Sequence, residues 1–315
     1  MIDQVVNHDS DVAIPCRLCK DGTCITTLYR AAALTVKKCR RCGLVFLDDA
    51  ADEASLVKLY GEDYFQTRAR YFFGNRVADP EAGTDNDNLA EFDEGLRALR
   101  QLLPQRGRLL DVGCGVGIFA RMAQDDNWQV TGIDVSTYAS RYAREHFGLD
   151  VRQGTVQSVA LDSASFDAVT MWDLVEHVPD PVGELVSVAR VLKRGGYLLV
   201  NTPNEAGALK MLAGIGYHMS LGAFCYPVNK LYHHYHLTYF TAATLSSALE
   251  RSGLRSVTVR QNSIPIVKAR GSSWEKAIVW GLSWFERLLG REYQLLIIAQ
   301  KPNGADQKPH SAVRE

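Results

Sequence analysis

Residues 108–124, RLLDVGCGVGIFARMAQ, join an apolar run to a helical pattern through three glycines. The apolar run covers 109–112, and the glycines follow at Gly113, Gly115 and Gly117. Glycine tolerates backbone conformations that a Cβ forbids, so glycines after a strand usually let the backbone approach a ligand closely. The stretch predicts a strand, a ligand-binding turn and a helix, and it leaves open whether the ligand carries a phosphate.

The residues that follow continue this pattern as a regular alternation of short apolar runs and amphipathic stretches. Strands are expected at 108–112, 128–133, 149–153, 166–171 and 196–201. Helices are expected near 117–126, 136–147, 181–193 and 241–252. The segment KRGG at 193–196 is expected to end the third helix. Such an alternation is typical of an α/β fold with a parallel sheet covered by helices on both faces.

Residues 115–120 fit the dinucleotide motif G-x-G-x-x-A, and three further features bear on whether the ligand is a dinucleotide. Asp111 stands two residues before the first glycine, where a carboxylate would repel a pyrophosphate and suit a positively charged ligand. Asp134, in VTGIDVS, ends the second strand and suits the hydroxyls of a ribose in either kind of ligand. The fourth strand continues into SFDAVTMWDLVEHVPDP at 165–181, which a nicotinamide-binding domain does not require. The position of Asp111 and this continuation count against a dinucleotide.

Four segments together resemble the motifs of class I S-adenosylmethionine-dependent methyltransferases: LLDVGCGVG, VTGIDVS, SFDAVTMWDLVEHVPDP and VLKRGGYLLVNTPN. The resemblance covers about residues 96–302 and is closest to the ubiquinone-type and secondary-metabolite methyltransferases. It implies a Rossmann-like domain with a mostly parallel seven-stranded sheet and an antiparallel last strand. It also implies an enzyme whose methyl-donating cofactor, S-adenosylmethionine, is a sulfonium nucleoside without phosphate.

The same resemblance implies where the cofactor binds. Asp111, Gly113, Gly115 and Gly117 match the first motif of the family, which cradles the methionine part of the cofactor. Amides at a helix N-terminus suit the methionine carboxylate, because the helix dipole favours an anion there. Asp134 matches the acidic residue that binds the ribose in the family.

Three further positions are cofactor candidates by the same resemblance. Many relatives have an acidic residue near the adenine after the third strand, but here Thr155 and Val156 stand at that place. We therefore expect Val156 to pack against the adenine. Trp172 and Asp173 follow the fourth strand and are expected to border the methionine end and the methyl group. The alternative for this pair is structural: a buried tryptophan and a carboxylate that caps the next helix.

Four histidines are candidates for the base that removes a proton from the acceptor. A well-placed base speeds such a step by about 10²–10⁴-fold, and histidine has an unperturbed pKa near 6.5. His177, in VEHVPDP, follows the fourth strand at the edge of the sheet where open α/β folds bind ligands. His233, His234 and His236 stand together in YHHYHLTYF at 232–240. Each could instead be a structural histidine that only forms hydrogen bonds.

Residues 204–240 form a long insertion after the fifth strand, and in relatives such an insertion contributes a lid over the acceptor. Its glycines predict mobility, because lids need to move: Gly207, Gly214, Gly216 and Gly222. Thr241, directly after the insertion, is expected to cap the helix at 241–252.

Cys16, Cys19, Cys39 and Cys42 form two C-x-x-C pairs near the N-terminus. Each pair brings two thiolates to one ion, and two pairs complete the tetrahedron that Zn²⁺ prefers. Four protein ligands leave no open position, so the site would be structural. The spacing predicts a zinc ribbon at 1–48, the alternative being unligated or redox-active cysteines. A ribbon of this kind also precedes the domain in sugar C-methyltransferases and in one group of ribosomal RNA methyltransferases.

The segment between the ribbon and the main domain is acidic and aromatic. Its aromatic side chains either line the mouth of the pocket or pack the segment onto the domain: Tyr60, Tyr64, Phe65, Tyr71, Phe72 and Phe73. A tryptophan-rich amphipathic helix is expected at 272–291, packed on the core, on another subunit or weakly on a membrane surface. The predicted order is ribbon, accessory segment, methyltransferase domain and disordered tail, at 1–48, 49–95, 96–302 and 303–315.

The composition of the whole chain limits its partners. A formal net charge of −1, with 46% hydrophobic and 23% charged residues, gives no general attraction to nucleic acid or to an anionic membrane. The N-terminal residues show no apolar signal segment, and no apolar run approaches the roughly 20 residues that span a bilayer. A cytoplasmic protein without a transmembrane segment is expected.

The leading interpretation is methyl transfer to a hydroxyl or an activated carbon of a small-molecule acceptor, such as a sugar, a lipid-linked compound or a secondary metabolite. A ribosomal RNA methyltransferase is the second, favoured by Lys37, Lys38, Arg40 and Arg41 and opposed by the near-zero net charge. A non-catalytic binding protein that retains the fold is the third, and the intact glycine turn argues against it. The sequence identifies neither the acceptor nor the oligomeric state.

Overall fold

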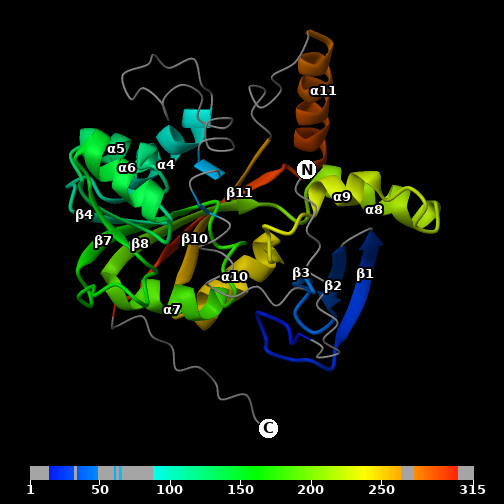
Figure 1. Ribbon diagram of the computed structural model, residues 1–315, viewed down its shortest axis with the longest axis horizontal. Coiled ribbons are helices and arrows are strands. Elements are labelled where there is room, and N and C mark those ends of the chain that lie inside the picture. The colour runs from blue at the N-terminus through cyan, green and yellow to red at the C-terminus, as the bar shows by residue number, and fades with distance from the viewer. Residues whose placement is uncertain are drawn as a thin grey trace.

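The computed structural model describes residues 14–31, 34–48, 60–61, 64–65, 88–263 and 273–303. Within them, two β-sheets and the surrounding helices form the framework (Figure 1). The larger sheet has seven strands and the smaller has four. Several predicted features, including Tyr71, Phe72, Phe73 and the tail at 304–315, lie outside the described residues.

The seven-stranded sheet runs in the order β10-β11-β8-β7-β4-β5-β6. Its strands are β4 (Arg108–Val112), β5 (Gln129–Asp134), β6 (Asp150–Gln153), β7 (Phe166–Trp172), β8 (Leu192–Pro203), β10 (Arg255–Asn262) and β11 (Gln294–Gln300). Neighbours from β8 to β6 pair in parallel, whereas β11 runs antiparallel to both β8 and β10. The predicted α/β sheet with an antiparallel last strand is confirmed.

Helices cover both faces of this sheet. Leu109 of β4 packs with residues of α4 (Asn88–Leu102) and α5 (Ile118–Asp125). Its neighbour Leu110 points to the other face and packs with residues of α7 (Pro181–Val191) and α10 (Ala242–Arg251), as the period of two in a strand requires. Figure 1 shows α4, α5 and α6 (Thr137–Phe147) on one side of the sheet and α7 and α10 on the other. Both faces are therefore buried, and the ends of the strands remain for a site.

The predicted end of the third helix is wrong by two residues. The helix α7 ends at Val191, and KRGG lies inside β8. There the amide of Gly195 donates to the carbonyl of Lys301, and the amide of Lys301 donates to the carbonyl of Gly196. These partners follow β11 in the chain, so a backbone contact across more than 100 residues overrides the local stop signal.

The smaller sheet combines the predicted ribbon with one strand of the lid insertion. Its strands pair antiparallel in the order β1 (Ile25–Ala31), β2 (Leu34–Cys39), β3 (Val45–Leu47) and β9 (Thr238–Tyr239). Leu44 and Phe46 belong to the same hydrophobic cluster as Val175 and Phe240 of the larger domain. The ribbon and the methyltransferase domain therefore share one core.

The lid insertion contains α8 (Ala208–Met219), α9 (Tyr226–Leu231) and β9. Gly214 lies inside α8, where a Cβ would lie 2.4 Å from the hydroxyl oxygen of Tyr29 on β1. This glycine lets the helix pack closely on the ribbon, while the mobility of the insertion stays a prediction. After the insertion, Thr241 caps α10 through a reciprocal pair of hydrogen bonds with Thr244, as the sequence predicts.

Two glycine-to-alanine substitutions should have opposite effects on stability. Gly214→Ala should lower the free energy of unfolding by about 1–3 kcal/mol, because the added methyl collides with the hydroxyl group of Tyr29. Gly281→Ala in α11 (Ser273–Leu289) should raise it by roughly 0.5–1 kcal/mol, because a Cβ there meets nothing within 4 Å and alanine favours the helix. Chemical denaturation of both variants measures this. Equal effects would contradict the packing of α8 on β1.

The amphipathic stretch near the C-terminus forms α11, which extends away from the sheet in Figure 1. Trp280, Trp284 and Leu288 are exposed on it, whereas Ser283 and Glu286 are buried. Leu288 belongs to the helical face that the sequence predicts to pack on the core, on another subunit or on a membrane surface, and it does not pack into the core. None of the described helices has the length and apolar character needed to cross a membrane.

Candidate functional site

The turn after β4 needs glycine for two reasons. Gly113 and Gly117 have φ angles of +70° and +88°, in the left-handed region that disfavours other residues. A Cβ on Gly113 would lie 2.9 Å from Leu174, and one on Gly117 would lie 2.7 Å from Leu149. Gly117 is the N-cap of α5, so the turn passes directly into the helix.

Asp134 ties this turn to the second strand. One carboxylate oxygen accepts a hydrogen bond of 2.9 Å from the amide of Gly115, and the other accepts one of 2.8 Å from the amide of Ser136. Burial raises the pKa of Asp134, and these two amides oppose the rise. The carboxylate is therefore held in a fixed position at the edge of the pocket, with lone pairs left for a ligand.

Asp111 is buried beside it and accepts a hydrogen bond of 2.7 Å from the hydroxyl of Thr170. Burial raises the pKa of Asp111 to about 7, the Thr170 hydrogen bond lowers it, and the charge of Asp134 raises it. Two desolvated carboxylates close together favour a positively charged ligand, which would stabilise their ionised forms. This fits S-adenosylmethionine and opposes a pyrophosphate.

The raised pKa of Asp111 predicts a pH dependence of cofactor binding. Below about pH 7 the carboxyl group is protonated in the free protein, so a cationic ligand must first displace a proton. S-adenosylhomocysteine is the matched ligand, because its sulfur carries no charge. The ratio of the affinity for S-adenosylmethionine to that for S-adenosylhomocysteine should therefore rise by up to about tenfold between pH 6 and pH 8. Calorimetric titrations at both pH values measure the ratio. A ratio that does not change, or that changes equally in Asp111→Asn, would contradict this role.

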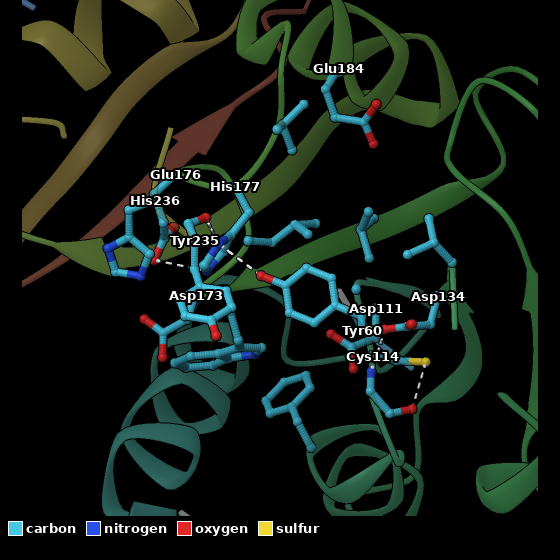
Figure 2. Close-up of a pocket in the computed structure, with 18 of the residues that line it drawn as sticks. Tyr60, Asp111, Cys114, Asp134, Asp173, Glu176, His177, Glu184, Tyr235 and His236 are labelled. Atoms are coloured by element: carbon cyan, nitrogen blue, oxygen red, sulfur yellow. Dashed lines mark hydrogen bonds and ion pairs between the residues drawn. The ribbon is translucent and has the colours of Figure 1, made fainter. Parts of the chain in front are cut away.

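A cavity of about 710 Å³ opens from this turn. One end is formed by the β4–α5 turn and the end of β5; the other is formed by the end of β7, the loop to α7 and the lid insertion. Figure 2 shows Asp111, Cys114 and Asp134 at the first end, and His177, Glu176 and His236 at the second. We refer to these as the cofactor end and the acceptor end.

His177 is fixed at the acceptor end by its Nδ1 atom. Nδ1 forms a hydrogen bond with the backbone carbonyl of Tyr235 and lies 2.8 Å from the hydroxyl of Tyr60 (Figure 2). A carbonyl only accepts, so Nδ1 carries the proton and Nε2 keeps its lone pair. Burial lowers the pKa of His177 to about 4, so the ring is neutral at physiological pH. Its Nε2 atom can accept a proton.

Glu176 and His236 lie beside this imidazole. Glu176 accepts a hydrogen bond of 2.8 Å from Thr202 through Oε2, and its Oε1 lies 4.0 Å from Nε2 of His177. Burial and the charge of Asp173 raise the pKa of Glu176, and burial lowers the pKa of His236. Because the donor atoms of Glu176, His177 and His236 lie within 4.8 Å of one another, this group could also hold a metal ion.

Trp172 and Asp173 line the cavity at the end of β7. The ring of Trp172 packs against Phe92 and Phe119 at centroid distances of 4.8 and 5.0 Å. Asp173 has a φ of +45°, an unfavourable conformation for a residue with a Cβ, and accepts a hydrogen bond of 2.7 Å from Gln294. Both residues line the cavity, and their contact with the cofactor stays a prediction.

The structure brings most of the predicted site residues to this cavity: Asp111, Gly113, Gly115, Asp134, Trp172, Asp173, His177, His233 and His236. Three lie elsewhere. Gly117 caps α5, Val156 is buried in the hydrophobic core, and His234 does not line the cavity. Gly154 and Thr155 line the cavity next to the place expected of Val156.

Sequence reasoning missed five residues of the acceptor end: Glu91, Glu176, Tyr235, Tyr293 and Gln294. For Glu176, the one signal in the sequence is its place directly before the candidate base His177. The others come from α4, the lid and the start of β11, where the local sequence shows only helix or strand patterns. Among the accessory aromatics, Tyr60, Tyr64 and Phe65 do line the cavity.

The four predicted metal ligands come together at one point. The sulfur atoms of Cys16, Cys19, Cys39 and Cys42 lie within 4.8 Å of one another, with 3.4 Å between Cys16 and Cys42 and 3.6 Å between Cys19 and Cys39. These separations fit a tetrahedron of thiolates around Zn²⁺, whose bonds to sulfur are about 2.3 Å. Burial raises the pKa of Cys16 to about 11, and a bound cation would reverse this shift. The set could hold a structural Zn²⁺.

Comparisons with known proteins agree with this geometry. A family model described as a methyltransferase domain matches residues 86–259. Ubiquinone biosynthesis O-methyltransferase of Paracidovorax citrulli is 38% identical over 129 residues, which are 38% of this chain and 54% of that protein. The protein of the same name from Alkalilimnicola ehrlichii is 40% identical over 115 residues, which are 35% of this chain and 47% of that protein. The chain thus spans about half the length of the curated relatives it matches.

A solved structure of an S-adenosylmethionine-dependent methyltransferase from Mesorhizobium loti is also similar, with 22% identity and a TM-score of 0.45. The similarity covers 65% of this chain and 96% of that one. The family model covers more than half of the chain and includes the glycine turn, Asp134 and His177. The chain belongs to the methyltransferase-domain family, within the class I S-adenosylmethionine-dependent methyltransferases.

Proposed function

We propose that the chain transfers a methyl group from S-adenosylmethionine to a hydroxyl oxygen of a small-molecule acceptor, with His177 as the proton acceptor. The observation that carries this proposal is a neutral imidazole that is fixed through Nδ1 and lines the same cavity as the Asp111–Asp134 pair. The relatives named above are O-methyltransferases, which supports oxygen over nitrogen or carbon as the acceptor atom.

The residues of the cofactor end hold the nucleoside. Asp134 accepts hydrogen bonds from the ribose hydroxyls, and the glycine turn lets the backbone approach the methionine part. Bound there, S-adenosylmethionine supplies a methyl carbon activated by a sulfonium. Trp172 and Phe92 exclude water between the two ends, and alignment of the acceptor alone lowers the barrier by roughly 7–11 kcal/mol.

At the acceptor end, the Nε2 atom of His177 takes the hydroxyl proton as the oxygen–carbon bond forms and the sulfur–carbon bond breaks. Tyr235 holds the ring in the tautomer that makes this possible. Glu91 and Asp173 also line this end, so an anionic group next to the reacting hydroxyl would be repelled. The acceptor is therefore a neutral or cationic hydroxyl compound rather than a phosphate ester or a carboxylate.

The charges around the cysteine pairs support a small molecule over RNA. Lys37 pairs with Asp48 at 2.6 Å, and Arg41 pairs with Asp21 at 3.1 Å. Lys20 pairs with Asp180 at 2.8 Å. Cations already paired with carboxylates do not form the basic stripe that phosphate neutralisation needs.

Incubation with methyl-tritiated S-adenosylmethionine and a cell extract, fractionated into metabolites and RNA, tests the proposal. We expect label in the metabolite fraction, and none with His177→Gln. Label in RNA would favour the ribosomal RNA alternative. If calorimetry detects no binding of S-adenosylhomocysteine, the non-catalytic alternative stands instead.

A further inference from the structure

The predicted ribbon touches the loop that carries His177 at two separate places. This loop, residues 174–180, joins β7 to α7 and lines the acceptor end with Glu176, His177 and several neighbours. One contact runs through the strand β9, and the other runs through Arg17, which lies between the first two cysteines. Neither contact reaches the cofactor end.

The first contact is a continuous set of backbone hydrogen bonds. Strand β3 of the ribbon pairs with β9, and the amide of Leu47 donates to the carbonyl of Leu237 at 3.1 Å. The amides of Leu237 and Thr238 in turn donate to the backbone carbonyl of Glu176, at 2.8 and 3.1 Å. The position of Glu176, and with it His177, therefore depends on where β3 lies.

The second contact holds the other end of the loop. Nη1 of Arg17 donates to the backbone carbonyl of Pro179 at 2.8 Å, and Arg17 is only 7% exposed. A hydrogen bond from a charged donor in such a place contributes more than an exposed ion pair. The neighbouring pair between Lys20 and Asp180 is more than half exposed on both sides and contributes little. Arg17 is the principal anchor of Pro179.

Both contacts depend on the fold of the ribbon, which is too small to be stable by itself. A segment of this size buries too little apolar surface, and structural Zn²⁺ usually supplies the missing free energy. Cys16 and Cys19 flank Arg17, whereas Cys39 ends β2 and Cys42 lies just before β3. A metal ion bound by the four sulfur atoms would therefore hold Arg17 and β3 together. In contrast, the hydrogen bonds of the cofactor end, such as that from Gly113 to Ile133, join the turn after β4 to β5 and do not involve the ribbon.

We propose that the metal-bound ribbon is a positioning element for the acceptor end: through Arg17 and β9 it fixes the loop that carries Glu176 and His177. Metal loss therefore releases the acceptor end and leaves cofactor binding intact. The inference rests on the proposed function only in naming this end of the cavity the acceptor end.

Amide hydrogen exchange tests the proposal. It is measured on the full chain with zinc bound and again after a chelator has removed the zinc. We expect the amides of Leu47, Leu237 and Thr238 to exchange at least tenfold faster without zinc. Amides of β4 and β5 should be unchanged, and the affinity for S-adenosylhomocysteine should stay within about twofold. Unchanged exchange at 237–238 would overturn the proposal, and so would equal acceleration throughout β4 and β5, which would mean global unfolding.

Two arginine variants separate positioning from folding of the ribbon. Arg17→Met keeps an apolar stem but loses the hydrogen bond to Pro179, so the amide of His177, which donates to Leu174 within the loop, should exchange several-fold faster with zinc content unchanged. Arg17→Lys should restore part of the protection. Arg41→Met is the matched control, because within the part of the chain that the structure describes Arg41 pairs with Asp21 of the ribbon itself, at 3.1 Å, and not with the loop.

If Arg17→Met and Arg41→Met behave alike, Arg17 has no positioning role. If Arg17→Met loses its zinc, Arg17 stabilises the ribbon rather than the loop. That result would overturn the role of Arg17 in positioning the loop. None of these readouts needs an acceptor. Their failure would leave the proposed methyl transfer untouched, and failure of the methyl transfer would not alter them.

Discussion

His177→Gln should lower the rate of methyl transfer by about 10²–10⁴-fold, the usual contribution of a positioned general base. The amide of glutamine can still donate to the Tyr235 carbonyl, but it offers no basic nitrogen at the position of Nε2. The cofactor end is formed by other residues, so the affinity for S-adenosylhomocysteine should stay within about twofold. Single-turnover rates and calorimetry measure the two effects separately.

His234→Gln is the matched control, because His234 belongs to the same histidine cluster but does not line the cavity. It should change the rate by less than about threefold, as expected of a residue that contributes no general base. A His177→Gln variant that keeps its full rate would exclude His177 as the base and point to His236, whose ring centroid lies 4.6 Å from that of His177.

Asp134→Asn should weaken the binding of S-adenosylmethionine and S-adenosylhomocysteine by about 10–100-fold. Hydrogen bonds to a charged group are worth roughly 1.5–3 kcal/mol, and the substitution removes the charge that would receive the ribose hydroxyls. The side-chain amide of asparagine would also face the backbone amide of Gly115 or Ser136. Both of these amides donate to Asp134, so one of the two hydrogen bonds would be lost. Calorimetric titration with both ligands measures the loss.

Asp125→Asn in α5 is the control for this variant. Asp125 is exposed and pairs only with Arg121 one turn away, at 3.0 Å, so the affinity for either ligand should not change. Equal effects of the two substitutions would show that Asp134 has no contact with the ribose.

The fold was predictable because its signals are local. The strands β4 and β7 are short apolar runs buried on both faces, and each is followed by turn residues that end it. The end of α7 was not predictable, because KRGG has the composition of a helix stop. Its strand conformation comes from a pairing with Lys301, which lies far away in the sequence.

The two ends of the cavity differ in the same way. The cofactor end comes from one continuous motif and one acid on the next strand, so Asp111 and Asp134 could be identified from the sequence. The acceptor end is assembled from several distant segments, including Glu91 of α4 and Gln294 of β11. The pairing of β9 with the ribbon was equally hidden, since a strand of two residues has no periodicity to detect.

The central claim is that one cavity holds a phosphate-free nucleoside between Asp134 and His177. A crystal structure of the chain with S-adenosylhomocysteine tests it most directly. We predict the ribose hydroxyls within hydrogen-bond distance of Asp134, and the sulfur directed past Trp172 toward Nε2 of His177. A nucleoside bound outside this cavity, or a sulfur directed away from His177, would contradict the account.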